Sequence, residues 1–157
     1  MMNSGLLNDF ILPCVYAFLS CLFFSLLFQL SWKRIPLVCL GGALGWAVYL
    51  LLGPMDEVLK YLVASVVISI YSEVMARICK VPVILFLTVA VLPLVPGGGM
   101  YYTMEYCARG EMELFFETGV HTLALAGAIA LGIMLTSSLM RMWRVMNRPV
   151  HGRKNRL

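Results

Sequence analysis

Apolar residues occur in five long runs along the chain, and short polar segments separate these runs. An apolar stretch of roughly 18 or more residues with few charges is typical of a transmembrane helix. The pattern therefore predicts an all-α integral membrane protein with five transmembrane helices in a single domain, residues 1–140, followed by a basic cytoplasmic tail, residues 141–157. The expected spans are about residues 6–30, 35–52, 58–76, 81–106 and 119–140.

The fourth span is interrupted by a proline and glycine motif, Pro93-Leu94-Val95-Pro96-Gly97-Gly98-Gly99. Val81 to Val95 would form only about 22 Å of helix, against a hydrocarbon core of roughly 30 Å. We expect the helix to stop within the membrane and to resume near Met100, where backbone must be buried in protein or line a wet cavity. A restarting helix there would aim free N–H groups into the cavity, as in broken-helix transporters. The alternative is a plain helix that ends at the outer interface, with the glycines as a loop.

The composition excludes a soluble globular domain. The 157 residues are 61% apolar and only 13% charged, whereas charged residues make up about a quarter of soluble domains. No Lys or Arg precedes the first apolar run, which is also too long for the apolar core of a secretory signal. We therefore expect the N-terminal segment to remain attached.

Positive charge is divided unevenly between the two sets of loops. If the N-terminus lies outside, only Lys60 and Arg109 fall outside, together with every acidic residue except Glu73. The bias predicts an outside N-terminus and a cytoplasmic C-terminus, and it favours a fourth segment that crosses the membrane. The tail cations also suit contact with anionic membrane lipid. The predicted inside cations are Lys33, Arg34, Arg77, Lys80, Arg141, Arg144, Arg148, Arg153, Lys154 and Arg156.

Motifs that would indicate an enzyme are missing. Gly97-Gly98-Gly99 lacks the lysine and following hydroxyl residue of a nucleotide-binding P-loop. The spans contain no Ser-His-Asp set, the cysteines form no CxxC motif, and His121 and His151 are far apart. We therefore expect no catalytic residues, no metal site, no cofactor and no nucleic-acid partner. His121 is expected to be an interfacial or hydrogen-bonded residue.

The third span carries a narrow polar stripe. Ser65, Ser69 and Ser72 recur at helical spacing, and Glu73 lies at the edge of the stripe. A carboxylate near the membrane is costly unless it is paired or hydrated. Glu73 is four residues from Arg77, which is consistent with a local ion pair or with a proton or cation relay. We favour the ion pair because Glu73 lies near the end of the helix.

Small residues recur every four positions in two of the spans. Gly41 and Gly45 form such a pair in the second span, and a longer row follows in the fifth. Rows of this kind allow two helices to approach closely. They predict a helix contact at each place without identifying the partner helix. The row in the fifth span is Ala124, Ala128, Gly132 and Thr136.

Three motifs resemble the small membrane subunit of the bacterial threonine/serine exporter-like (ThrE-type) family, and the resemblance extends over nearly the whole chain. The Pro-x-x-Pro-Gly-x-Gly-x-Tyr pattern is the most specific part. In that family two membrane halves occur in one long protein or in two chains, and this chain resembles the smaller half. The motifs are Ser72-Glu73-Val74-Met75-Ala76-Arg77, Lys80-Val81-Pro82 and Pro93-Leu94-Val95-Pro96-Gly97-Gly98-Gly99-Met100-Tyr101-Tyr102.

The resemblance implies one subunit of a two-component secondary exporter in the bacterial inner membrane, with the larger subunit of the same family as partner. The implied substrates are small carboxylate-bearing metabolites, either threonine and serine or small dicarboxylates such as succinate. Without a nucleotide motif, transport is expected to use an ion gradient or to run downhill. The candidate substrate-binding residues are Gly97, Gly98, Gly99, Tyr101, Tyr102 and Thr103 at the helix restart, with Ser69, Ser72 and Glu73 along the inner path.

Two other functions remain open from the sequence. A non-transporting membrane subunit that stabilises or assembles a larger complex would need no wet cavity near Gly97–Gly99. A small homodimeric cation exporter would need a deep acid in an early span, and the first span has none beyond Asp9.

Overall fold

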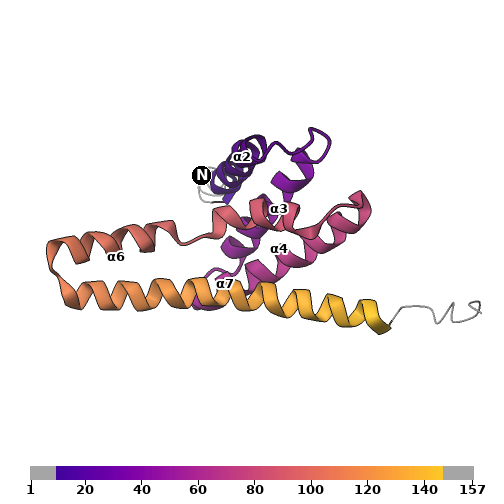
Figure 1. Ribbon diagram of the computed structural model, residues 1–157. Helices are drawn as coiled ribbons and strands as arrows, with labels where there is room; N and C mark the ends of the chain where they lie inside the picture. Colours follow the sequence, from indigo (N-terminus) through magenta and orange to yellow (C-terminus); the bar gives the residue numbers. More distant parts are fainter. Residues whose placement is uncertain (1–9, 147–157) are drawn as a thin grey trace, which may run out of the picture.

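The computed structural model describes residues 10–146, and this part of the chain is helical apart from short turns (Figure 1). Residues 1–9 and 147–157 lie outside the described part, and they include most of the predicted basic tail. The predicted all-α class is confirmed. The elements are α2 (Leu12–Leu27), α3 (Ile35–Leu51), α4 (Glu57–Cys79), α5 (Val83–Val91), the 3-10 helix η2 (Leu92–Leu94), α6 (Gly97–Arg109) and α7 (Met112–Met146).

Proline and left-handed residues set several helix boundaries. Pro13 and Pro36 occupy the first turn of α2 and α3, where the missing backbone donor has no intrahelical role. α4 ends at Lys80 and α6 at Gly110, which have φ values of 53° and 76°. A left-handed residue is a common way to end a helix, and it turns the chain sharply into the next one.

α4 lies at the centre of the packing and contacts α3, α5 and α7. A Cβ atom added to Gly45 of α3 would collide with Ile68 of α4, and one added to Gly132 of α7 would collide with Ser65. The small-residue rows therefore pack within the chain, and α4 is the partner helix for both. Ala124, at one end of the second row, is exposed.

The interrupted segment is anchored in the core. Leu94 of η2 is 1% exposed and packs in one apolar cluster with Ile68 of α4 and Leu125 of α7. A second cluster joins α2, α3 and α5 around Val38 and Phe86. At the break, Leu94 and Pro96 are thus buried in protein, whereas Val95, Gly97 and Gly98 are exposed.

Two helices are long and apolar enough to cross a membrane, namely α4 and the part of α7 from Met112 to Trp143. Val83–Leu94 and Gly97–Arg109 together provide a third candidate span, bent by 55° at the break. α2 and α3 are shorter apolar helices of 16 and 17 residues. These lengths establish two to three candidate spans, and the expected count of five stays a prediction.

The break occurs at the predicted motif, but the predicted restart of the helix near Met100 is wrong. The second half of the broken segment begins at Gly97, three residues before Met100, because the glycines adopt helical backbone and form the first turn of α6. α7 begins at Met112, before the expected fifth span of about residues 119–140, and contains that whole span. α6 and the beginning of α7 form a hairpin that extends away from the other helices (Figure 1).

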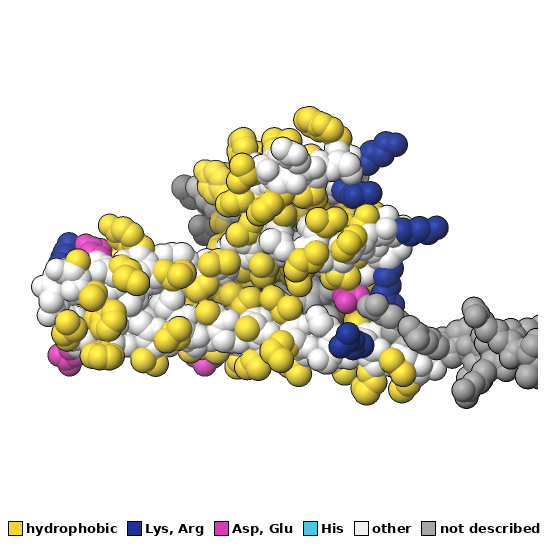
Figure 2. Space-filling view, in the orientation of Figure 1, with side chains coloured by type: hydrophobic (Ala, Val, Ile, Leu, Met, Phe, Trp, Pro, Cys, Tyr) yellow, Lys and Arg dark blue, Asp and Glu magenta, His cyan; other side chains and the backbone are white. Residues whose placement is uncertain are grey.

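Charged side chains are separated along the molecule. Figure 2 shows most Lys and Arg side chains at the end of the molecule opposite the tip of the α6–α7 hairpin, and most Asp and Glu side chains toward that tip. Large apolar side chains cover much of the surface between the two ends. This distribution is the one expected of a protein with an apolar belt and a positively charged face.

Candidate functional site

The break between α5 and α6 is built from short-range backbone contacts. Val95 is extended, with φ −62° and ψ 128°, and Pro96 precedes the first turn of α6. The Gly97 N–H donates to the Val95 carbonyl at 2.7 Å, and the Met100 N–H donates to the Pro96 carbonyl at 3.2 Å. The N–H groups between them belong to the first turn of a helix, where intrahelical acceptors are missing and the helix dipole is positive.

A cavity of about 400 Å³ adjoins this turn, and we name it the PGGG cavity. Three helices and the break meet around it. α3 contributes Trp46, α4 contributes Glu57 and Tyr61, and α7 contributes a polar stripe that includes His121. The break itself contributes Gly97, Gly98 and Gly99 together with Pro93, Val95 and Pro96.

The three glycines of the motif differ in their surroundings. A Cβ atom at Gly97 or Gly98 would meet nothing within 4 Å, so both backbones are approachable from the cavity side. A Cβ atom at Gly99 would collide with the hydroxyl of Thr122 on α7. Gly99 is therefore required by the close approach of α6 and α7, whereas Gly97 and Gly98 leave space that a ligand could occupy.

One side-chain contact between α4 and α7 crosses the rim of the PGGG cavity. His121 Nε2 of α7 lies 3.4 Å from Glu57 Oε2 at the start of α4. The Tyr49 hydroxyl donates to Glu57 Oε1 at 3.5 Å, and the Tyr49 ring packs edge-on against Tyr61 at 5.1 Å. The cavity thus presents N–H donors on one wall and a carboxylate with aromatic rings on another. Such a lining suits a small molecule that carries both a carboxylate and an ammonium group.

Trp46 adds an unusual polar group to this aromatic wall. Its ring stacks on Tyr49 at 5.3 Å. Among the described residues, its buried indole Nε1–H has no hydrogen-bond partner. An unpaired buried donor costs free energy, about 1–3 kcal/mol, unless a ligand or solvent accepts from it.

Three predicted site residues lie on α6 but do not line the PGGG cavity. Tyr101 and Tyr102 are exposed and pack edge-on against each other at 5.4 Å. Thr103 donates its hydroxyl to the Gly99 carbonyl at 2.7 Å. The helix restarts at Gly97, so these side chains lie one turn further along α6 than the sequence suggested.

The remaining predicted residues are buried on α4. No partner is present within residues 10–146 for the hydroxyls of Ser69 and Ser72. Glu73 forms the expected ion pair with Arg77, with Oε2 and Nη2 3.5 Å apart. Glu73 and Arg77 also line a second cavity, described below, at the cation-rich end of the molecule. A relay role for Glu73 stays a prediction.

Sequence reasoning missed the α7 side of the PGGG cavity. Thr118, His121, Thr122 and Leu125 recur at spacings of three and four residues, which is the signature of one helix face. The signal was present in the sequence. Its meaning depends on α7 beginning at Met112 and lying against Gly99, which only the folded chain shows.

Comparison with known proteins identifies the family. Residues 13–139 match the family described as threonine/serine exporter, ThrE. No curated protein and no solved structure matches the chain. The matched segment contains all of α3 to α6, both cavities and most of α7. This chain, a membrane protein built of apolar helices, therefore belongs to the threonine/serine exporter (ThrE) family, a family of transporters and not of enzymes.

Proposed function

We propose that this chain is the smaller subunit of a two-component secondary exporter in the bacterial inner membrane. The larger subunit of the same family would supply the other half of the transport path. The exported molecule would be a small metabolite with a carboxylate, and the two substrate classes are threonine with serine and small dicarboxylates such as succinate. The chain would cross the membrane five times, with its N-terminus outside.

The observation that carries this proposal is the broken helix at the PGGG cavity. α6 begins at the edge of the PGGG cavity, whose volume is about 400 Å³ and whose lining includes Gly97 and Gly98. Backbone N–H groups at a helix start bind carboxylates and phosphates. Broken helices at the middle of the membrane serve this purpose in secondary transporters.

Charges in the same cavity favour an amino acid over a dicarboxylate. Glu57 lines the wall that also carries Tyr61 and Trp46, and a second carboxylate on the substrate would be repelled there. An ammonium group would be attracted to Glu57 and to the aromatic rings. We therefore place the carboxylate at Gly97–Gly99 and the ammonium group near Glu57.

The exposed surface of the α6–α7 hairpin supports the proposal that this chain binds a partner subunit. α6 contacts α7 and extends away from α2 to α5 (Figure 1), and its Tyr101, Tyr102 and Met104 are exposed. We assign these side chains to the surface that meets the larger subunit. On the inner side, Ser69, Ser72 and Glu73 would line the continuation of the path.

The experiment measures export of threonine, serine and succinate from liposomes or cells with this chain alone, with the larger subunit alone and with both. Export is expected only with both subunits. Full activity of the purified 157-residue chain alone would contradict the two-component proposal. The alternative is a non-transporting assembly subunit. In that case no substrate should be exported, and cysteines placed at Gly97 or Gly98 should not react with a water-soluble maleimide.

A further inference from the structure

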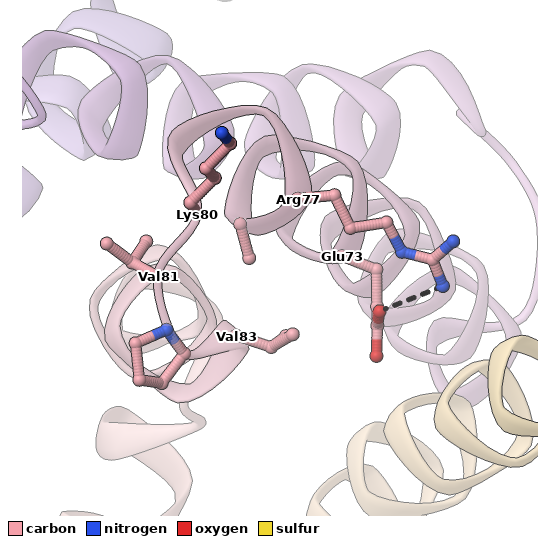
Figure 3. A pocket seen from close by; sticks show the side chains of 7 residues that line it. Glu73, Arg77, Lys80, Val81 and Val83 are labelled. Carbon is pink, nitrogen blue, oxygen red and sulfur yellow. Dashed lines mark hydrogen bonds and ion pairs between the residues drawn. The ribbon is translucent and has the colours of Figure 1, made fainter. Parts of the chain in front are cut away.

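The second cavity lies where α4 turns into α5, and we name it the cationic cavity (Figure 3). Its volume is about 650 Å³. Glu73, Arg77 and Lys80 border it from the last turns of α4, and Val81, Pro82 and Val83 border it from the start of α5. Two cations and one carboxylate give the lining a net positive charge.

The contact between the Glu73 carboxylate and Arg77 in this cavity is long. Glu73 has a side chain that is only 8% exposed, whereas the Arg77 side chain is 44% exposed. Their atoms are 3.5 Å apart, which is long for a charge-assisted hydrogen bond, about 2.7–2.9 Å. Figure 3 shows Arg77 extending from α4 with one end of its guanidinium toward Glu73.

Arg77 also contacts a residue of α7. Its Nη2 lies 3.9 Å from Met140 Sδ of α7, so the guanidinium sits between α4 and α7. A planar guanidinium has five N–H donors in a fork that matches a carboxylate. The contacts of Arg77 with Glu73 and with Met140 both go through Nη2.

Lys80 borders this cavity and has an uncommon, left-handed backbone conformation. It is the left-handed residue that ends α4, with φ 53° and ψ 47°. Glycine or asparagine usually fills such a position, because a side chain there is unfavourable. Lysine at this point adds a second positive charge beside the cavity, and it also meets the negative end of the α4 dipole.

We propose that the cationic cavity is a second substrate site, which receives the carboxylate of a small metabolite on Arg77 with Lys80 adding positive charge nearby, and that Glu73 competes with this carboxylate for Arg77. The inference rests on the proposed exporter function. It adds an entry site at the cation-rich end, distinct from the PGGG cavity. In the empty state Glu73 occupies the guanidinium, and an arriving carboxylate displaces it.

The competition predicts opposite effects for the two partners of one ion pair. Arg77→Gln removes the binding group, so the KM for substrate presented at the cation-rich face should rise about tenfold, the scale of one charge-assisted hydrogen bond. Glu73→Gln removes the competitor and leaves the cation, so KM should fall. If the pair only braces the end of α4, both variants should lower protein stability or maximal rate and leave KM unchanged.

Everted membrane vesicles that contain both subunits present this face to the medium under the predicted topology. Initial uptake of radiolabelled threonine and of radiolabelled succinate is measured against concentration for the native chain, Arg77→Gln, Lys80→Gln and Glu73→Gln. Lys33→Gln is the matched control, since Lys33 is an exposed cation outside the cavity, between α2 and α3. A rise in KM with Arg77→Gln and Lys80→Gln, a fall with Glu73→Gln and no change with Lys33→Gln are expected. Equal KM values for Arg77→Gln and Lys33→Gln, or a rise with Glu73→Gln, would overturn the inference.

A second measurement does not depend on transport. Phenylglyoxal modification of Arg77 in the purified two-subunit complex is followed by mass spectrometry, with succinate or its neutral diamide at equal ionic strength. Succinate should protect Arg77, the diamide should not, and protection should strengthen in Glu73→Gln. Protection without any export by the native complex would refute the proposed exporter function and leave this site standing. Failure of succinate to protect Arg77 would overturn the inference. Protection of Arg77 by phosphatidylglycerol alone would also overturn it, because the cations would then bind lipid headgroups.

Discussion

At the scale of single residues, the three adjacent glycines serve two different purposes. Gly99 allows α6 to lie against Thr122 of α7, and any side chain there must displace that contact. Gly97 and Gly98 have open space where a Cβ atom would be, so packing does not explain them. Their value lies in leaving the first turn of α6 open to the cavity.

Gly98→Val is therefore expected to fold and to stop transport. The added side chain would occupy the PGGG cavity beside the N–H groups, and export should fall about tenfold or more, the scale of losing one ionic hydrogen bond. Gly127→Val is the matched control, because a Cβ atom at Gly127 also meets nothing within 4 Å and Gly127 does not line the cavity. Export rates are compared at equal amounts of membrane-inserted protein. Intact export by Gly98→Val would place the substrate elsewhere.

At the scale of helices, α4 and α7 pack against each other between the PGGG cavity and the cation-rich end of the molecule. α7 has 35 residues, which corresponds to about 52 Å of helix against a hydrocarbon core of roughly 30 Å. The small residues on its buried face, Ala128, Gly132 and Thr136, bring it close to α4. His121 and Glu57 connect the same two helices at the rim of the PGGG cavity.

Gly132→Ala is expected to destabilise this contact. The new Cβ atom would collide with the Ser65 hydroxyl and lie 3.0 Å from the Leu62 carbonyl oxygen, which belongs to backbone and cannot rotate away. Overpacking of this kind costs about 1–3 kcal/mol. The melting temperature of the purified protein in detergent should fall accordingly.

Gly127→Ala tests the opposite case on the same helix. Its Cβ atom would enter open space, and alanine favours helix over glycine by up to about 1 kcal/mol. The melting temperature should stay the same or rise slightly. Equal melting temperatures for Gly132→Ala and Gly127→Ala would show that the α4–α7 contact is looser than described.

At the scale of the whole molecule, charge separation predicts the orientation in the membrane. The cations at the α2–α3 turn, the α4–α5 turn and the end of α7 gather at one end, and the acidic hairpin tip lies at the other (Figure 2). The positive end is expected to face the cytoplasm.

Single cysteines at Lys33 and Glu111 test this orientation in a background without the five native cysteines. Both positions are exposed, so a membrane-impermeant maleimide can reach them from the correct side. Glu111→Cys should react in intact cells, and Lys33→Cys should react only after the membrane is opened. The cysteine-free parent supplies the background signal. Reaction of Lys33→Cys in intact cells would reverse the topology.

The sequence by itself determined the helical class, the break at Pro93–Gly99, the Glu73–Arg77 pair and the resemblance to the exporter family. Each depends on composition or on residues within a few positions of one another, which local physics governs directly. Proline removes a donor wherever it stands, and residues four apart on a helix are neighbours in any fold. The helix restart was misplaced by three residues because glycine permits helical backbone as readily as a loop.

Only the tertiary structure decided which residues share a cavity. Trp46, Glu57 and His121 lie on three different helices, and their meeting beside Gly98 depends on how α3, α4 and α7 pack. Tyr101 and Tyr102 follow the glycines closely in sequence but are exposed and do not line the cavity, because they lie one turn further along α6. Local spacing in the sequence does not specify how distant segments pack, so only the folded chain shows which residues form the site.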